Sequence, residues 1–282
     1  RAAAGIVTIN SNAVMEFISG TLNGAGDWQI DGALNWNGGS ISGTGGTFFN
    51  GSLNIMGPTT KTLISRTLTL DGTTTWTGGD ISPANSAVFR IGEGANFNIQ
   101  TDKDFFSGGI LELDGILNKN TTLGTTTISS VLNSHDILNI NSGTLILNNS
   151  GTHDTQFNVA SGATLAFNGG THSFNDSVMV GPGQVIVDGT LTVLDVIASK
   201  TLATSSNLDF ILTKGTLRGD GNWILAGLEW QGGTIAGAGG FTLTGPLDWT
   251  TSASKTLDTR TLTFPSPLVG TWLGGNITLL NG

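Results

Sequence analysis

The sequence lacks cysteine, is poor in charge and proline, and has no long apolar run. Its 282 residues include 0 Cys and 6 Pro, and charged residues make up 11% of the chain. Without cysteine, disulfide bonds, cysteine-ligated zinc and thiol catalysis are excluded. No apolar run approaches the roughly 20 residues that a membrane-spanning helix needs. We therefore expect no membrane span in this segment.

Basic residues are especially scarce. The chain has 11 Lys and Arg against 20 Asp and Glu, which gives a formal net charge of −9. The basic residues are scattered, whereas a protein that binds nucleic acid needs a basic stripe to neutralise phosphates. We expect no nucleic-acid partner. A disordered chain is also excluded, because hydrophobic residues still make up 38% of the sequence.

What the sequence does contain is glycine, at 43 residues, and a recurring tripeptide of Leu, a mostly polar residue and a second apolar residue. Examples are "LNW" at 34, "LNI" at 53 and "LEL" at 111. This alternation is typical of a short strand with one face buried. The third residue of the tripeptide recurs about every twenty residues, which predicts one inward column: Trp36, Ile55, Trp76, Phe97, Leu117 and Ile140.

No segment carries the apolar spacing of an amphipathic helix, and Gly, Asn, Ser and Thr fill the stretches between strands. A β-sandwich or barrel is the alternative, but neither predicts a twenty-residue repeat. We expect an all-β, single-stranded parallel β-helix, or β-solenoid. Its coils would hold about 20 residues and two or three short strands each, wind right-handed, and place Gly or Asn at the corners.

A longer repeat overlies the short one. Residues 34–69 and 228–263 align without a gap at an offset of 194, with 17 of 36 positions identical. The shared phrases include "WNGGSISGTGG" and "WQGGTIAGAGG", and "KTL" followed by "RTLT". A solenoid accounts for such nested repeats. We expect 1–282 to be one continuous solenoid with about one and a half copies of a 194-residue unit.

These repeats resemble those of very large bacterial β-strand-repeat surface proteins, similar to the β-helices of filamentous haemagglutinins and autotransporter passengers. The stretches "GTLNGAGDWQIDGALNWNGGSISGTGG" and "FNVASGATLAFNGGTHSF" carry the resemblance. It implies a secreted or surface-displayed β-helix that acts as a stalk, an adhesin or a matrix component.

Candidate chemistry is sparse. Asp102 and Asp104, and Glu112 and Asp114, stand at i, i+2 spacing, which on a strand puts each pair on one face. A weak calcium site or a glycan-cleaving carboxylate pair is one reading. A solvated turn around Lys103 is the other. The segment Arg218–Asp220 reads "RGD", a tripeptide that integrins recognise. Thr-x-Thr also recurs, but without the regularity that an ice-binding face needs.

The three histidines, His135, His153 and His172, are 18 and 19 residues apart, close to one coil. They are therefore expected to stack in one column along an edge. One reading is a metal-binding or pH-sensitive ladder. The other is a column of polar turn residues.

We therefore predict a structural protein without catalytic, cofactor or metal residues. It would be a bacterial stalk, fibre or matrix segment, secreted or at the cell surface, whose partner is itself through end-to-end stacking or further repeats of the same chain. The alternative is an adhesin or a carbohydrate-binding or carbohydrate-cleaving β-helix with surface glycans as partners. That alternative needs exposed aromatic residues, so the expectation that Trp36, Trp76, Trp230 and Trp272 point inward argues against it.

Overall fold

The computed structural model describes residues 5–264 and 270–281, whereas residues 1–4, 265–269 and 282 lie outside the described part. The described chain is all-β and contains no helix. Its strands form parallel sheets stacked as a β-solenoid of about 13 turns, spaced about 21 residues apart. The predicted fold class and coil length are confirmed. The winding direction stays a prediction.

The chain divides into two compact units, Arg1–Ile137 (unit 1) and Leu138–Gly282 (unit 2), each described by itself. In both, a regular turn contributes one strand to each of three parallel sheets. Whether the whole of 1–282 forms one continuous solenoid stays a prediction.

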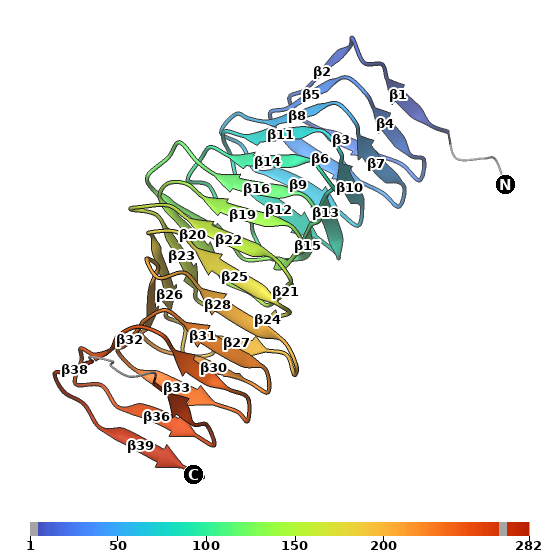
Figure 1. Cartoon of the computed structure of the whole chain (residues 1–282). Helices are drawn as coiled ribbons and strands as arrows, with labels where there is room; N and C mark the ends of the chain where they lie inside the picture. Colours follow the sequence, from blue (N-terminus) through green and yellow to red (C-terminus); the bar gives the residue numbers. More distant parts are fainter. Residues whose placement is uncertain (1–4, 265–269, 282) are drawn as a thin grey trace. The chain divides into compact units, whose positions relative to one another are not determined.

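The strands of unit 1 lie side by side within three sheets (Figure 1, blue to green). The first sheet contains β1 (Val7–Ile9), β4 (Trp28–Ile30), β7 (Gly46–Phe49), β10 (Thr67–Leu70), β13 (Ala87–Ile91), β15 (Gly109–Leu113) and β18 (Val131–Ser134). The second contains β2 (Val14–Phe17), β5 (Ala33–Trp36), β8 (Ser52–Ile55), β11 (Thr73–Trp76), β14 (Asn96–Ile99) and β16 (Ile116–Lys119). The third contains β3 (Thr21–Asn23), β6 (Gly39–Ser42), β9 (Lys61–Ile64) and β12 (Ile81–Ala84). The strand β17 (Thr125–Ile128) follows later in the chain and is not part of this four-stranded sheet.

Unit 2 repeats this plan, and the short strand β19 (Ile137–Ile140) spans the boundary. Its first sheet contains β21 (Gly151–His153), β24 (Thr171–Phe174), β27 (Val193–Val196), β30 (Thr216–Gly219), β33 (Gly233–Ala236), β36 (Lys255–Asp258) and β39 (Ile277–Leu280). Its second contains β22 (Gln156–Val159), β25 (Ser177–Val180), β28 (Thr201–Thr204), β31 (Asn222–Leu225), β34 (Phe241–Leu243) and β37 (Leu262–Thr263). Its third contains β20 (Thr144–Leu147), β23 (Thr164–Phe167), β26 (Gln184–Val187), β29 (Asp209–Leu212), β32 (Leu228–Trp230), β35 (Leu247–Trp249) and β38 (Thr271–Trp272).

The inward faces follow the alternation in the sequence. In the second sheet of unit 1, the inward column is Trp36, Ile55, Trp76, Ile99 and Lys119. The predicted column named Phe97 and Leu117 in fourth and fifth place, but Phe97 pairs with Thr74 and Leu117 pairs with Phe97, so both lie one inward position earlier. The longer turn before β14 causes this shift, since the register there jumps by 23 residues rather than 19 or 21. Both positions still point inward and are buried.

The glycine pairs form sharp corners between the second and third sheets. Trp36 ends β5, and Gly39 opens β6 with a φ of 86°. A Cβ on Gly39 would lie 2.5 Å from the backbone oxygen of Gly20 in the preceding turn, so only glycine fits this stack. Ile41 then points inward and is buried. The repeated "WNGGSIS" phrase is therefore a strand end, a corner and the start of the next strand.

The third sheet of unit 1 is interrupted after β12. The expected strand is replaced by an irregular stretch, residues 100–108, in which only Phe105 keeps the ladder, through bridges to Ile81 and Ile128. Phe105 is fully buried. The turn keeps its apolar anchor but loses the regular backbone pairing on either side of it, so side chains must satisfy the freed polar groups.

Asparagine side chains at outward positions form amide ladders between neighbouring turns. Asn54 Nδ2 donates to Asn35 Oδ1 at 2.8 Å, and Asn118 Nδ2 donates to Asn98 Oδ1 at 3.1 Å. These pairs stabilise the register of neighbouring strands. Within the described residues, no helix is long and apolar enough to cross a membrane.

Candidate functional site

A dense cluster of polar contacts lies inside unit 1, around the buried guanidinium of Arg66. Arg66 Nε donates to Thr47 Oγ1 at 2.6 Å. Its Nη1 donates to the backbone oxygens of Gly24 at 3.0 Å and Ser42 at 3.2 Å. Its Nη2 donates to those of Gly26 and Gly46, both at 2.7 Å. All five N–H groups therefore have acceptors.

These acceptors come from the same corner of two preceding turns. Gly24 and Gly26 lie between β3 and β4, Ser42 precedes β7, and Arg66 itself lies between β9 and β10. Burial lowers the pKa of Arg66, and the charge of Asp27 partly offsets this. The guanidinium thus links three successive turns through charge-assisted hydrogen bonds.

Lys61 is a second buried cation, five residues before Arg66. It occupies an inward position of β9, in register with Gly39 and Ile81. Its Nζ donates to Gly57 O at 2.9 Å and Gly78 O at 2.8 Å, which belong to the corners of two successive turns. Burial lowers its pKa to about 8, and the charge of Asp80 acts in the opposite direction.

The second copy of the repeat places the same two cations inside unit 2. Lys255 is fully buried and donates to the backbone oxygens of Thr251 at 3.1 Å and Ala253 at 2.9 Å. Arg260 is also buried and donates through Nε to Gly237 O at 3.3 Å and through Nη2 to Gly219 O. Burial lowers the pKa of both side chains.

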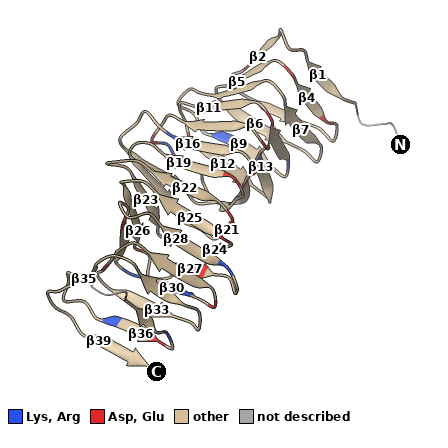
Figure 2. Cartoon of the chain, viewed as in Figure 1, with Lys and Arg blue, Asp and Glu red and all other residues tan. Residues whose placement is uncertain are grey.

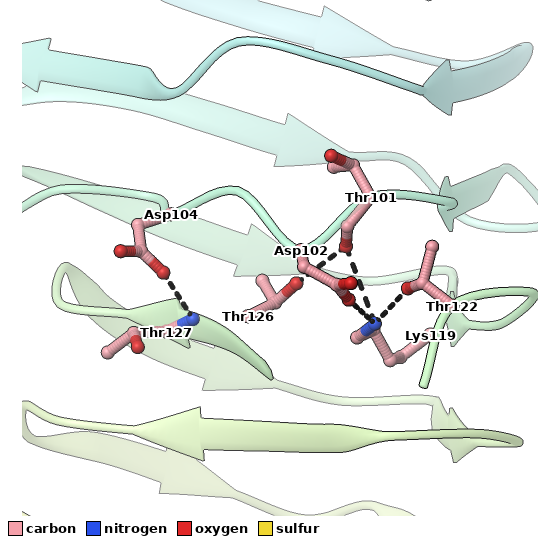
Figure 3. Close-up of polar contacts among 7 residues, drawn as sticks. All are labelled: Thr101, Asp102, Asp104, Lys119, Thr122, Thr126 and Thr127. Carbon is pink, nitrogen blue, oxygen red and sulfur yellow. Dashed lines mark hydrogen bonds and ion pairs between the residues drawn. The ribbon is translucent and has the colours of Figure 1, made fainter. Parts of the chain in front are cut away.

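A third buried lysine, Lys119, organises the interrupted stretch (Figure 3). Its Nζ donates to Asp102 Oδ1 at 3.0 Å and to Thr122 Oγ1 at 2.5 Å, and contacts Thr101 O at 3.4 Å. Burial raises the pKa of Asp102, but hydrogen bonds from Thr122 and Lys119 outweigh it and hold that pKa below its ordinary value. Asp102 is therefore an ionised partner that neutralises Lys119.

The predicted carboxylate pairs are not brought together to bind a ligand. Residues 102–104 do not form a strand, so the one-face prediction for Asp102 and Asp104 is wrong. Asp104 Oδ1 instead accepts the backbone N–H of Thr127 at 2.8 Å (Figure 3). The interrupted ladder is the reason, because Asp104 supplies an acceptor that a paired strand would otherwise provide.

The second predicted carboxylate pair, Glu112 and Asp114, is likewise engaged by other side chains of unit 1. Glu112 points outward from β15 and accepts from Asn133 Nδ2 at 2.8 Å, whereas Asp114 forms an ion pair with Arg90 at 2.5 Å. Across the described residues, no group of three or more His, Asp and Glu side chains is placed to hold a metal ion. The geometry gives no support to calcium binding at Asp102, Asp104, Glu112 or Asp114.

The histidines do not form one column. His153 and His172 are buried in unit 2, and His153 Nε2 lies 3.0 Å from His172 Nδ1. The register nevertheless pairs His172 with Gly151, and His153 with Phe174, so the two belong to neighbouring inward positions. His135 lies exposed in the turn after β18 of unit 1. The interpretation of the histidines as polar turn residues therefore fits His135 alone.

Of the four tryptophans that were predicted to point inward, three do so, since Trp36, Trp76 and Trp230 are fully buried. Trp272 is 58% exposed, so the prediction is wrong there. Trp272 occupies the last strand of its sheet, where no described strand covers its far side. Its Nε1 still donates to Gly274 O at 3.1 Å, as Trp36 Nε1 does to Gly38 O.

The "RGD" segment is built into the solenoid. Arg218 and Gly219 belong to β30, and Arg218 pairs with Asp195 at 3.2 Å. The backbone oxygen of Gly219 accepts from Arg260. These contacts assign a stacking role to the segment, and no extended recognition loop presents it.

Sequence reasoning missed the inward cations. A signal was available, since Lys61 and Arg66 recur as Lys255 and Arg260 in the strand-like phrases "KTLISRTLT" and "KTLDTRTLT". Alternation also puts Lys61 on the same face as Leu63, which is buried. Charged residues are few and scattered along both units (Figure 2), and several of them form ion pairs, such as Arg90 with Asp114 and Lys200 with Asp176.

In comparisons with known proteins, no family model, no curated protein and no solved structure matches the chain.

Proposed function

We propose that this chain is a structural, non-catalytic segment of a secreted or cell-surface bacterial protein, in which stacked turns serve as a stalk, fibre or matrix. The observation that carries the proposal is the use made of the buried cations. Arg66 links three successive turns through backbone oxygens, and Lys61 links two. Such contacts hold successive turns together and engage these side chains within the fold.

The proposed partner is a further turn of the same kind, from a second copy or from more repeats of the same chain. Leu279 in β39 occupies an inward position, in register with Leu257 and, one turn earlier, Ile235. Ile235 is fully buried, whereas Leu279 is 70% exposed because no described turn covers it. Stacking another turn there would bury apolar surface and pair the free strand edge.

Electron microscopy and sedimentation of the purified chain test this proposal. We expect particles that lengthen as the protein concentration rises. Leu279→Asp should block lengthening, because it places a charge in the contact. Thr278→Asp is the matched control, since Thr278 points outward from the same strand and should leave lengthening unchanged. Short, monodisperse particles of the unaltered chain at all concentrations would contradict end-to-end stacking.

One observation favours a second candidate, carbohydrate binding. A hollow of about 280 Å³ lies along the third sheet of unit 2, lined by Asp209, Glu229 and Asp248 among others. Glu229 and Asp248 are in register on neighbouring strands and point outward. Their oxygens are suitable acceptors for sugar hydroxyls.

Glycan-array binding tests this second candidate. The variant Asp209→Asn/Glu229→Gln/Asp248→Asn should lose any signal that the unaltered chain shows. An unaltered chain that binds no glycan on the array would contradict carbohydrate binding in the hollow. A variant that binds as well as the unaltered chain would contradict it too.

A further inference from the structure

The irregular stretch of unit 1, residues 100–108, is longer than any other connection between consecutive strands in the described part of the chain. It joins β14 to β15, and Lys103 lies exposed near its centre. Residues 106–108 are exposed as well. Exposed connections of this kind are the usual sites of proteolytic cleavage, because strand pairing does not hold their backbone.

One cause of the break in the ladder is Pro83 in β12. Two residues earlier in the same strand, Ile81 donates its backbone N–H to Asp104 O at 3.0 Å, toward the irregular stretch. Alternate residues of a parallel strand direct their N–H groups to the same side, so position 83 would donate there too. Proline has no N–H to give. Regular pairing is therefore reduced to the bridges of Phe105 with Ile81 and Ile128.

Side chains supply part of what the ladder loses. Thr126 Oγ1 donates to Thr101 O at 2.8 Å, and Ser130 Oγ donates to Phe106 O at 2.6 Å. A few single hydroxyl contacts hold a segment less firmly than a series of backbone bonds, so we expect this stretch to open before the strands beside it. Opening has to expose the buried ring of Phe105, so the open form is a minor state on which a protease can draw.

The six lysines of the chain differ in their access to a protease. Three of them are fully buried: Lys61, Lys119 and Lys255. Lys200 and Lys214 lie in short corners between paired strands and form ion pairs with aspartates. A protease binds its substrate as an extended segment on both sides of the bond that it cleaves, and a short corner does not provide one. Of the six, Lys103 alone lies in a long irregular stretch.

We propose that residues 100–108 are a proteolytic processing site, at which a lysine-specific protease cleaves the peptide bond between Lys103 and Asp104. One water molecule is consumed: the C–N bond breaks, Lys103 gains a carboxylate and Asp104 gains an α-ammonium group. Asp102 and Asp104 flank the lysine, so the protease must accept carboxylates beside its lysine pocket. The inference concerns unit 1 and does not depend on the proposed function.

The fold already holds partners for the two new chain ends. The backbone N–H of Asp104 donates to Asp80 Oδ1 at 3.0 Å, and cleavage would turn this contact into an ion pair with the new ammonium group. On the other side of the cut, Lys119 Nζ lies 3.0 Å from Asp102 Oδ1, one residue before the new carboxylate (Figure 3). The cleaved chain should therefore stay folded as two associated fragments.

Limited digestion of the folded, full chain with a lysine-specific endopeptidase tests the proposal. We expect the fragments 1–103 and 104–282 to form roughly tenfold or more faster than any product of cleavage after Lys200 or Lys214, since cleavage follows local opening. The two fragments should elute together in size-exclusion chromatography. In urea the preference should disappear, because access rather than sequence sets it. A folded chain that is cut first at another lysine, or at several lysines equally fast, would overturn the proposal.

Variants identify the bond. Lys103→Gln should abolish the first cut, whereas Lys214→Gln is the matched control, an exposed lysine in a short corner, and should keep it. Circular dichroism of both variants verifies that they are folded. Fragmentation of Lys103→Gln as rapid as that of the unaltered chain would overturn the proposal.

The protein from its natural source provides the test of processing itself. Mass spectrometry of its chain ends should find an amino terminus at Asp104 and a carboxyl terminus at Lys103. Protein that is uncut at this bond in its natural source would overturn a processing role.

Discussion

The two copies of the repeated segment, 34–69 in unit 1 and 228–263 in unit 2, carry the same inward cations in different surroundings. In both, a lysine and an arginine five residues later are buried and donate to backbone oxygens. Arg66 has an acceptor for every N–H group. Arg260 Nη1 has none among the described residues.

A single replacement explains part of this difference. Thr47, which accepts from Arg66 Nε, corresponds to Phe241 in the second copy. Phe241 offers no oxygen, and its ring lies 5.7 Å from the guanidinium carbon of Arg260 instead. The lysines differ too, since Lys61 reaches the corners of two turns whereas Lys255 bonds within its own turn.

The cation positions recur because their main acceptors are backbone oxygens, which every corner supplies whatever its side chains. Side chains then decide how completely each cation is satisfied. We therefore expect the first copy to hold its turns together more strongly than the second.

The largest effect is expected from the arginines. Arg66→Met removes five hydrogen bonds and leaves buried oxygens without donors, which should lower the local free energy of unfolding by about 3–5 kcal/mol. Arg260→Met should cost about 1–3 kcal/mol, since fewer bonds are lost. Hydrogen exchange of each copy measures both values. Equal losses in the two copies would contradict the comparison.

The corner glycines should instead behave alike. Gly39 and Gly233 have φ values of 86° and 82°, and a Cβ would lie 2.5 and 2.6 Å from a backbone oxygen of the preceding turn. Alanine at either position should cost about 2–3 kcal/mol, because strain and a steric clash act together. Denaturant titration of the two variants checks this. Gly94→Ala is a useful reference, since no atom lies within 4 Å of that Cβ.

Raising the pH should stabilise the first copy through Lys61. Its pKa is about 8 in the fold against 10.5 in the open chain, so between these values the open chain holds more protons. Stability should therefore rise with pH from 8 to 10.5, by about 1–2 kcal/mol. The chain has no Tyr or Cys to titrate in this range. Hydrogen exchange around β9 measures the rise, and Lys61→Met should remove it; a rise that persists in this variant must have another origin.

The smallest difference is expected at the tryptophans. Trp36 Nε1 donates to Gly38 O at 3.1 Å, whereas Trp230 Nε1 has no partner among the described residues. Phenylalanine at position 36 should therefore cost about 1 kcal/mol more than phenylalanine at position 230, beyond the shared loss of packing. Parallel denaturation curves of the two variants provide the value. A larger loss at position 230 would show that packing outweighs the hydrogen bond.

Much of the fold could be predicted from local patterns. Alternation placed Leu34, Trp36 and Ile41 inward, and all three are buried. Glycine pairs located the corners. The predicted column was wrong at Phe97 because a turn of unusual length precedes β14. Alternation within a strand contains no information about turn length.

The candidate site was harder to predict, because its central residues are charged and a charged residue is normally expected at the surface. Lysine and arginine are normally solvent-exposed, so Lys61, Arg66 and Lys119 were not suspected of lying inside. Only the stack of turns shows that backbone oxygens gather at the corners in numbers sufficient to solvate a cation. The pairing of His153 with His172 likewise depends on two strands that are neighbours only in space.

The sequence by itself determined the all-β solenoid, the length of its turns and the glycine corners, because these follow from alternation and from φ values that one residue type tolerates. The tertiary structure decided which polar groups lie inside and what satisfies them. That outcome depends on oxygens and rings brought together from successive turns, 17 to 42 residues apart in the chain, and no local pattern encodes such distances.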